Sequence, residues 1–254
     1  MNILSILVLI VGASSRKNFK WENNIIPYYF EESVSTEDMD LIKSQMFLIE
    51  ENTCLQFSAK SQDDVQRHHL RIAVNQTQCN DADGKMRLSG RVDEDDGEVL
   101  FTSSYTLTDG ECGKNEYKAK GMILHILFLT FGASHMHRRP DRDQYIKINT
   151  DCIQERGLKM YKINTTTTWM AMSVPYTCDS LMHFRNDSGT KCSEDSCGGL
   201  CPTILPRPGN TDCDKIGSYE ANDVDWLMLN MYHCPVDRTA AKKDIWTIIL
   251  DLFL

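Results

Sequence analysis

From Met122 to Phe131 the chain is apolar at nearly every position, and only His125 and Thr130 are polar. A segment that is apolar on all sides predicts a helix buried inside the protein. Gly132 follows at once and predicts the end of that helix, because glycine readily adopts the left-handed backbone found at many helix ends. A second histidine, His135, comes three residues after the glycine.

Other segments have a helical or an alternating pattern. Residues 35–52 predict an amphipathic helix, because apolar residues recur at helical spacing and Ser35 with Asp38 is typical of an N-terminal cap. Residues 222–232 predict a further helix with one apolar face. After Ile148 the periodicity is lost, which predicts irregular structure. Short strands are expected at residues 55–57, 70–74, 99–101 and 103–107.

Composition and charge narrow the class of protein. The 254 residues are 41% hydrophobic and 25% charged, which is enough for one sizeable core in a single domain. A net charge of −9 makes nucleic acid an unsuitable partner. The acidic cluster at residues 93–96 is interpreted as a solvated loop. His68 and His69 are adjacent, so in a strand they would face opposite sides, which argues against a metal site there.

The N-terminus predicts export. Met1–Ser15 contains a short apolar run followed by small residues, which fits a secretory signal peptide cleaved near Ala13 to Ser15 and an extracellular location. Three N-x-S/T sequons agree with that location and are candidate glycosylation sites: Asn75, Asn164 and Asn186. At the other end, Ile245–Leu254 is mostly apolar but too short to span a membrane, so we expect no transmembrane segment.

The chain has ten cysteines and no C-x-x-C pair. An even number in an exported protein predicts disulfides. The spacing of Cys192, Cys197 and Cys201, with Cys213 beyond them, could indicate a zinc site. The Gly/Pro-rich surroundings favour a disulfide-stapled loop instead.

Three motifs point to one family. His125, Gly132 and His135 have the spacing of the first histidine, the glycine and the third histidine in H-E-x-x-H-x-x-G-x-x-H. The segment R-P-D-R-D-Q-Y at 139–145 and the segment S-L-M-H-F at 180–184 then match the arm and the Met-turn that follow this motif. From Trp21 to Cys234 the chain therefore resembles the astacin zinc metalloproteases.

That resemblance implies an α+β fold. It consists of an N-terminal twisted β-sheet with two long helices, followed by an irregular, disulfide-stapled C-terminal subdomain. The expected domain covers residues 16–234, between the signal peptide at 1–15 and a short tail at 235–254. Met182 is expected to pack beneath the metal position, and Asp141, Arg142 and Asp143 are expected to form buried ion pairs. The implied disulfides are Cys54–Cys234 and Cys79–Cys112. The pairing of the remaining cysteines is left open: Cys152, Cys178, Cys192, Cys197, Cys201 and Cys213.

The chain departs from the family pattern at the positions that carry its chemistry. Ile126 stands where the family has its general-base glutamate, and Leu129 stands at the second zinc histidine. Phe184 replaces the Met-turn tyrosine, and Met136 replaces the glutamate that pairs with the mature N-terminus. These changes predict that no residue acts catalytically here.

Zinc is the cofactor of the family, but His125 and His135 would be only a remnant of its site. Since catalytic zinc normally takes three protein ligands, we expect zinc to be absent or weakly bound. His137 is a conceivable substitute, although alternation past Gly132 directs it away from His135. Ile126, Leu129 and Phe184 are expected to fill the vacated metal cavity with hydrocarbon.

The sequence therefore predicts a secreted pseudoprotease that binds a peptide or an extracellular protein in the former substrate cleft. The short interval between Ser15 and Trp21, with no space for the propeptide typical of the family, agrees with lost activity. One alternative is an active zinc endopeptidase with an atypical site. Another is a structural, cysteine-rich extracellular protein.

Overall fold

The computed structural model describes residues 21–32, 34–64, 69–74, 89–90, 99–101, 116–164, 172–192, 199–209 and 213–234. Several predictions lie outside these residues: the signal peptide, the acidic cluster at 93–96, the strand at 103–107, His68, Asn75, the Cys79–Cys112 pair, Cys197 and the tail at 235–254.

A five-stranded sheet forms the N-terminal half, in the order β2-β1-β3-β5-β4. All neighbouring strands are parallel except the edge strand β4, which runs antiparallel to β5. The predicted strands at 70–74 and 99–101 are confirmed, whereas the one predicted at 55–57 begins one residue later and continues to Ala59. The strand bounds are β1 Ile25–Phe30, β2 Gln56–Ala59, β3 Leu70–Val74, β4 Ser89–Gly90 and β5 Val99–Phe101.

The first helix, α1 (Thr36–Asn52), is the predicted amphipathic one. Its first turn is capped by Ser35, whose hydroxyl oxygen accepts a hydrogen bond from the Asp38 amide at 3.1 Å. Ile42, Met46 and Ile49 are buried on one face, as the spacing predicts, because that face packs into the core.

The second helix, α2 (Glu116–Thr130), begins six residues before the apolar run that predicted it. The added first turn has an exposed Tyr117, and its Glu116 pairs with Lys120 one turn later at 2.6 Å. The helix ends as predicted. Gly132 has φ of +91°, and the amides of Gly132 and Ala133 donate to earlier carbonyls in a Schellman arrangement.

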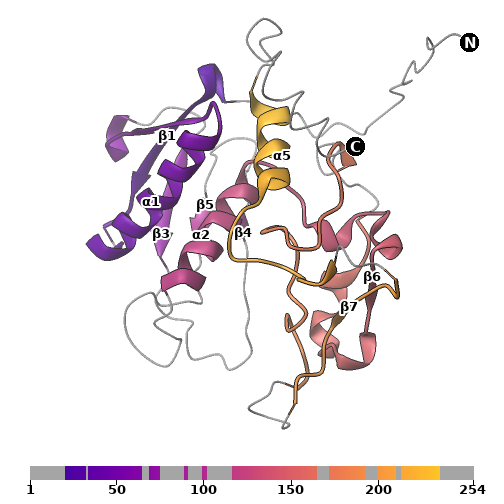
Figure 1. Ribbon diagram of the computed structural model, residues 1–254. Helices are drawn as coiled ribbons and strands as arrows, with labels where there is room; N and C mark the ends of the chain where they lie inside the picture. The colour runs from indigo at the N-terminus through magenta and orange to yellow at the C-terminus, as the bar shows by residue number, and fades with distance from the viewer. Residues whose placement is uncertain are drawn as a thin grey trace, which may run out of the picture.

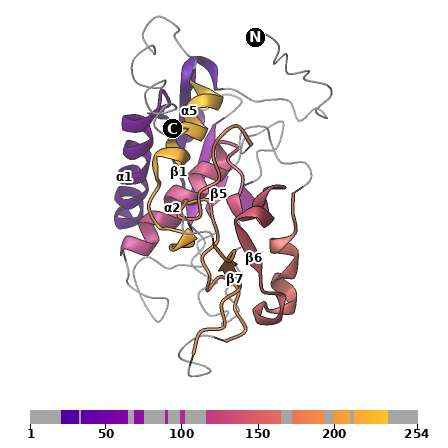
Figure 2. The ribbon, with the colours of Figure 1, turned by 45° about the vertical axis from the view of Figure 1, so that its right-hand side comes forward.

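The third helix, α5 (Asp223–His233), confirms the helix predicted at 222–232. Asn222 is its N-cap, and it forms a reciprocal capping box with Asp225. The main core contains residues of the sheet, α1, α2 and α5. Figures 1 and 2 show these three helices beside the sheet, with the β6–β7 region forming a separate lower part of the molecule.

That second part has little regular structure, as the loss of periodicity predicts. Its two-stranded antiparallel sheet pairs β6 (Ile146–Ile148) with β7 (Ile204–Pro206). A small core of its own forms around Ile146, Ile153 and Tyr161. Among the described residues the structure also has short 3-10 helices, of which η1 and η2 lie in the N-terminal half: η1 Glu22–Asn24, η2 Gln62–Asp64, η4 Met136–Arg138, η5 Arg142–Gln144, η6 Thr150–Cys152 and η7 Glu155–Tyr161.

Disulfides join segments that are far apart in the sequence. Cys54, just after α1, is bonded to Cys234, just after α5, which is the pairing that the resemblance implies. In the second part Cys152 pairs with Cys201, and Cys178 pairs with Cys213. Cys192 is also disulfide-bonded, so the cysteine-rich stretch is stapled, as its composition favoured.

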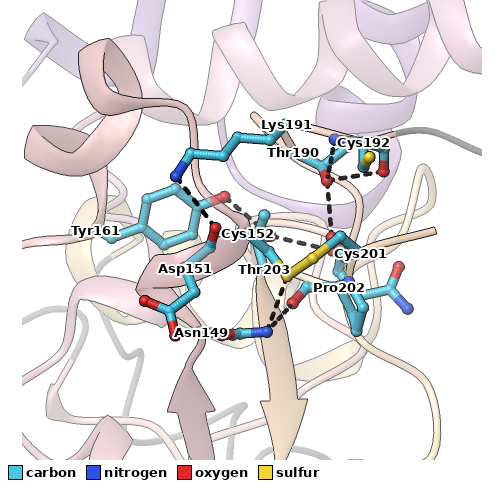
Figure 3. Close-up of a disulfide and its surroundings, with 11 residues drawn as sticks. Asn149, Asp151, Cys152, Tyr161, Thr190, Lys191, Cys192, Cys201, Pro202 and Thr203 are labelled. Carbon is cyan, nitrogen blue, oxygen red and sulfur yellow. Dashed lines mark hydrogen bonds between the residues drawn. A yellow bond between two sulfur atoms is a disulfide. The ribbon is translucent and has the colours of Figure 1, made fainter. Parts of the chain in front are cut away.

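Side-chain bonds support the Cys152–Cys201 bridge. The Asn149 amide donates to the Pro202 carbonyl at 3.1 Å, and the Thr190 hydroxyl donates to the Cys201 carbonyl at 2.7 Å (Figure 3). In the same view the Tyr161 hydroxyl contacts Thr203. These contacts tie the irregular loops to β7 without a continuous sheet.

Candidate functional site

The two histidines of the family motif meet in space. Nε2 of His125, on α2, lies 3.2 Å from Nε2 of His135, in the arm after Gly132. Nδ1 of His125 lies 2.9 Å from the Leu181 carbonyl oxygen in the Met-turn. His125 is 6% exposed, and His135 is half-buried. The pair therefore joins three segments: α2, the arm and the Met-turn.

The residues beside this pair on α2 are hydrocarbon. Leu129 follows His125 by one helical turn and so shares its face. It is half-buried and packs against the main core, and Ile126 is buried within that core. In the part of the chain that the structure describes, no three His, Cys, Asp or Glu side chains are grouped to hold a metal ion.

The spacing of His125 and His135 does not itself exclude a metal. Two nitrogens bound to one tetrahedral zinc at about 2.0–2.1 Å would stand about 3.3 Å apart, close to the separation seen here. What fails is the number of donors, because catalytic zinc normally takes three protein ligands and this site offers two. The residues present therefore do not fit the catalytic zinc of the family.

His137 does not supply the missing ligand. Its ring is fully buried and its centroid lies 5.2 Å from that of His135, so it is a close neighbour. Both of its nitrogens are engaged by the main chain, however. Nδ1 accepts from the Phe184 amide at 3.3 Å, and Nε2 lies 3.2 Å from the Met160 carbonyl oxygen. The expectation that alternation directs this residue away from His135 is wrong, because the two rings are in edge-on contact. The two main-chain bonds, rather than its direction, occupy its nitrogens.

Phe184 occupies the position of the family's tyrosine. Its ring stacks on His137, with centroids 3.9 Å apart, and meets His135 edge-on at 5.3 Å. It packs with the second core, whereas Ile126 and Leu129 pack with the main core. The prediction that these three side chains fill a single cavity together is therefore wrong. Each replacement extends the core nearest to it.

The Met-turn is fixed by hydrogen bonds to Asp225 of α5, a residue that the sequence analysis missed. The buried Asp225 carboxylate accepts from the Ser180 hydroxyl at 2.5 Å and from the Leu181 amide at 2.9 Å. Met182 is fully buried in the main core. The sequence signals Asp225 only as a helix cap, since Asn222-x-x-Asp225 before an apolar run is typical of a capping box, and its contact with the Met-turn has no local signal.

The arm is anchored by two arginines, and one prediction about them needs correction. Asp141 is in an ion pair, as expected, but its partner is Arg139, which was not predicted; Arg139 is buried and forms a bidentate pair with Asp141 at 2.9 and 2.7 Å. Arg142 makes only a marginal contact with Asp143, at 3.3 Å, and Asp143 is 55% exposed. The guanidinium of Arg142 instead donates to the carbonyls of His137 and Tyr161, because buried main-chain oxygens need donors there.

The residue that replaces the family's N-terminus-binding glutamate has become part of the core. Met136 is fully buried, and its sulfur lies 3.8 Å from the Arg139 guanidinium. Its amide donates to the Met182 carbonyl at 2.9 Å. A methionine here offers no charge to an inserted ammonium group, so it serves only as packing between the arm and the Met-turn.

Burial keeps the histidines of this region neutral. It lowers the pKa of His125 and holds the pKa values of His135 and His137 well below the usual range, because a buried imidazolium loses its hydration. Burial also lowers the pKa of His183 to about 4. The Tyr176 hydroxyl donates to Nε2 of neutral His183 at 2.8 Å. The site therefore presents neutral rings at neutral pH.

Comparison with known proteins places the chain in a family. Residues 13–97 and 108–234 match the family model Astacin, which describes a family of peptidases. Zinc metalloproteinase nas-22 of Caenorhabditis elegans is 28% identical over 89% of this chain, and zinc metalloproteinase nas-25 of the same nematode is 26% identical over 85%. The matched regions cover 53% and 47% of those two relatives, about half of their length.

A further relative and a solved structure are matched over a larger share of their own length. Astacin-like metalloprotease toxin 2 of the spider Loxosceles intermedia is 27% identical over 88% of this chain and 77% of its own length. The solved structure of high choriolytic enzyme 1, a hatching-enzyme zinc protease from the medaka fish Oryzias latipes, superposes with a TM-score of 0.63 at 22% identity. That superposition covers 85% of this chain and 94% of the hatching enzyme, and it shows a shared fold.

The sheet with its helices, the histidine pair and the Met-turn thus define a metalloprotease fold, and the predicted α+β architecture is confirmed. The family model matches most of the chain, so the family is shown as well as the fold. The protein belongs to the astacin family of peptidases.

Proposed function

We propose that this astacin is catalytically inactive and serves as a non-catalytic binding module. One observation carries the proposal: α2 has hydrocarbon at the two positions that supply the family's base and second zinc ligand. Ile126 lies in the main core, and Leu129 packs against it. Neither side chain can accept a proton or donate a lone pair.

The expected loss of rate is large. General acid–base assistance is typically worth about 10²- to 10⁴-fold in rate, and Ile126 removes it. Phe184 lacks the hydroxyl of the tyrosine it replaces, and one oxyanion-stabilising donor is worth on the order of 10²-fold or more. The two losses act on the same transition state, so restoring one group alone would not restore the enzyme.

Zinc is also absent or weakly held in this proposal. Neutral His125 and His135 are two good ligands, but Leu129 leaves the third position without a donor. His137 does not replace it, because its nitrogens are engaged by Met160 and Phe184. A two-imidazole site would release the ion to solvent and to competing ligands.

A binding role is supported by what the chain retains. The disulfide between Cys54 and Cys234, the capped helices and both cores preserve the scaffold that active relatives use to hold peptide substrates. The proposed partner is a peptide or an extracellular protein bound in the former substrate cleft. Among the described residues no helix is long and apolar enough to cross a membrane.

Secretion and glycosylation complete the proposal. Asn186 lies exposed in the turn after the Met-turn, and Thr203 holds its carbonyl through two hydrogen bonds, at 2.7 and 3.0 Å. Its backbone is therefore fixed while its side chain faces solvent, which suits a sequon that carries a glycan. Asn164 is half-buried and a less favourable acceptor.

Glycosylation is tested on protein secreted from a eukaryotic host. The intact mass should fall after N-glycosidase treatment. Both Asn186→Gln and Ser188→Ala should lack one glycan, since the second variant keeps the asparagine and breaks only the sequon. A mass equal to that of the bare polypeptide would contradict this part of the proposal.

Inactivity is tested by incubating the purified chain with casein and gelatin, with and without zinc and 1,10-phenanthroline. We expect no cleavage above a buffer blank. The competing function, an atypical zinc endopeptidase, is favoured only by the convergence of His125 and His135. It would be established by cleavage that the chelator abolishes and that His135→Ala also abolishes.

A further inference from the structure

The contact between His125 and His135 has a definite chemical form, which follows from their neighbours. The Leu181 carbonyl oxygen can only accept, so the imidazole nitrogen 2.9 Å from it must carry a proton. That nitrogen is Nδ1 of His125. A neutral imidazole has one N–H, so Nε2 of His125 is left with a lone pair.

The same reasoning fixes the proton of His135. Its Nε2 lies 3.2 Å from the lone pair on Nε2 of His125, within the range of an N–H···N hydrogen bond. Two lone pairs at this distance would repel each other. Nε2 of His135 must therefore be the protonated nitrogen whenever no metal lies between the rings.

We infer that the histidine pair forms a directed hydrogen-bond relay, in which His135 Nε2–H donates to His125 Nε2 and His125 Nδ1–H donates to the Leu181 carbonyl. The inference rests on the proposed loss of the catalytic zinc and goes beyond it. It gives the remnant histidines a present role, as a metal-independent tie between the arm, α2 and the Met-turn.

Packing around the relay supports this role. Phe184 meets the His135 ring edge-on at 5.3 Å, and its ring also stacks on His137, which limits the rotation of the arm. The Leu181 amide is bonded to the buried Asp225, so the carbonyl at the end of the relay belongs to a fixed turn. Each element that a zinc ion would connect is thus connected through two imidazoles.

A bound zinc would require a different proton arrangement. Both Nε2 atoms would donate lone pairs to the ion, so both rings would carry their proton on Nδ1. His125 has its proton on Nδ1 in either case. His135 is therefore the reporter, since its proton lies on Nε2 in the relay and on Nδ1 in a zinc site.

Nitrogen NMR of the full chain, labelled with ¹⁵N-histidine and dialysed against chelator at neutral pH, reads this directly. We expect His135 as the Nε2–H form, His125 as the Nδ1–H form, and a scalar coupling across the two Nε2 atoms. His135→Gln identifies the signals by their loss. A His135 ring protonated on Nδ1 in the chelator-treated chain would overturn the inference.

Thermal unfolding gives a second reading. His135→Ala should lower the unfolding midpoint by about 2–5 °C, and His135→Gln, whose side-chain amide can still donate to His125, should recover most of that loss. His69→Ala, which removes another half-buried ring away from the site, is the control for loss of an imidazole. Equal unfolding midpoints for the wild type and the His135→Ala variant would contradict a stabilising hydrogen bond between His135 and His125.

The two proposals fail separately. Chelator-sensitive cleavage of casein by a chain that shows the Nε2–H form when zinc-free would overturn the proposed function and leave the relay standing. An inactive chain with His135 protonated on Nδ1 would overturn the relay alone.

Discussion

The buried Asp225 carboxylate on α5 accepts a hydrogen bond from the Ser180 hydroxyl at 2.5 Å. Through this contact α5 holds the Met-turn. The carbonyl oxygen of the next residue in that turn, Leu181, is hydrogen-bonded to the His125 ring. The histidine pair is therefore supported by a residue of α5 that lies outside the motifs that identify the family. The Met-turn is thus held by protein hydrogen bonds from α5 as well as by its contact with the histidine pair.

Asp225 makes stability depend on pH. Burial raises its pKa from 3.8 to about 6, because the ionised carboxylate loses its hydration. The unfolded chain ionises near pH 4 while the folded chain keeps the proton, so stability falls as pH rises from about 4 to above 6. The loss from this group is about 3 kcal/mol.

The measurement is urea unfolding at several pH values for the wild type and for Asp225→Asn. The stability of the wild type relative to the variant should fall by about 3 kcal/mol between pH 4 and pH 7. Comparing two proteins with the same histidines removes the opposite contribution of the buried imidazoles. Asp223→Asn, which removes an exposed carboxylate from the same turn, is the control variant. If the difference in the free energy of unfolding between the wild type and Asp225→Asn did not change with pH, the raised pKa of Asp225 would be contradicted.

Gly121 allows α2 to approach the segment before α5. A β-carbon at this position would lie 2.4 Å from the Tyr219 carbonyl oxygen and 2.6 Å from its β-carbon. Since main chain cannot move aside cheaply, Gly121→Ala should destabilise the protein by roughly 2 kcal/mol or more, by the usual cost of overpacking. Gly157→Ala, whose new methyl would meet its nearest neighbour at 3.5 Å, is the matched control. Equal unfolding midpoints for the two variants would refute the close approach.

Arg139 should not tolerate lysine. Its planar guanidinium satisfies both oxygens of Asp141 and also donates to the Val174 carbonyl at 2.8 Å. Lysine keeps the charge but cannot reach all three acceptors, which leaves buried polar groups unpaired at a cost of about 2 kcal/mol. Denaturant unfolding of Arg139→Lys beside Arg138→Lys, whose guanidinium donates to the Lys162 carbonyl at the surface, measures the difference. Similar losses in both variants would mean that the fork geometry is unimportant.

Leu129 can be used to restore metal binding. Leu129→His returns an imidazole one turn after His125 and supplies a third ligand. A full structural zinc site is worth roughly 10–16 kcal/mol, so one added ligand should raise zinc affinity on the order of 10²-fold. Competition titration with a zinc-binding dye measures this, and Tyr117→His, exposed on the same helix, is the control. Unchanged affinity in Leu129→His would show that position 129 does not face the remnant site.

The sequence predicted most of the fold because its strongest elements have strong local signals. α1 has a cap and a regular apolar stripe, and α2 ends at Thr130, just before Gly132, whose positive φ terminates the helix. The first turn of α2 was missed because residues 116–120 are largely polar. The β6–β7 pair was missed because three-residue strands have too little alternation to detect.

The candidate site was predictable in composition but not in arrangement. Spacing identified His125 and His135, and the missing groups at positions 126, 129 and 184 followed from the motif. Which core each apolar side chain joins depends on tertiary packing, so the single filled cavity was a wrong inference. The carbonyl partners of Arg142 and the clamp by Asp225 depend on contacts between distant segments, which no local pattern records.

The most direct test of the account is the zinc content of the purified wild-type chain, measured by elemental mass spectrometry after dialysis against zinc-free buffer. The account predicts far less than one zinc ion per chain, since His125 and His135 are the only ligands that the described site offers. One zinc per chain that survives dialysis, and that is lost in His125→Ala, would contradict it.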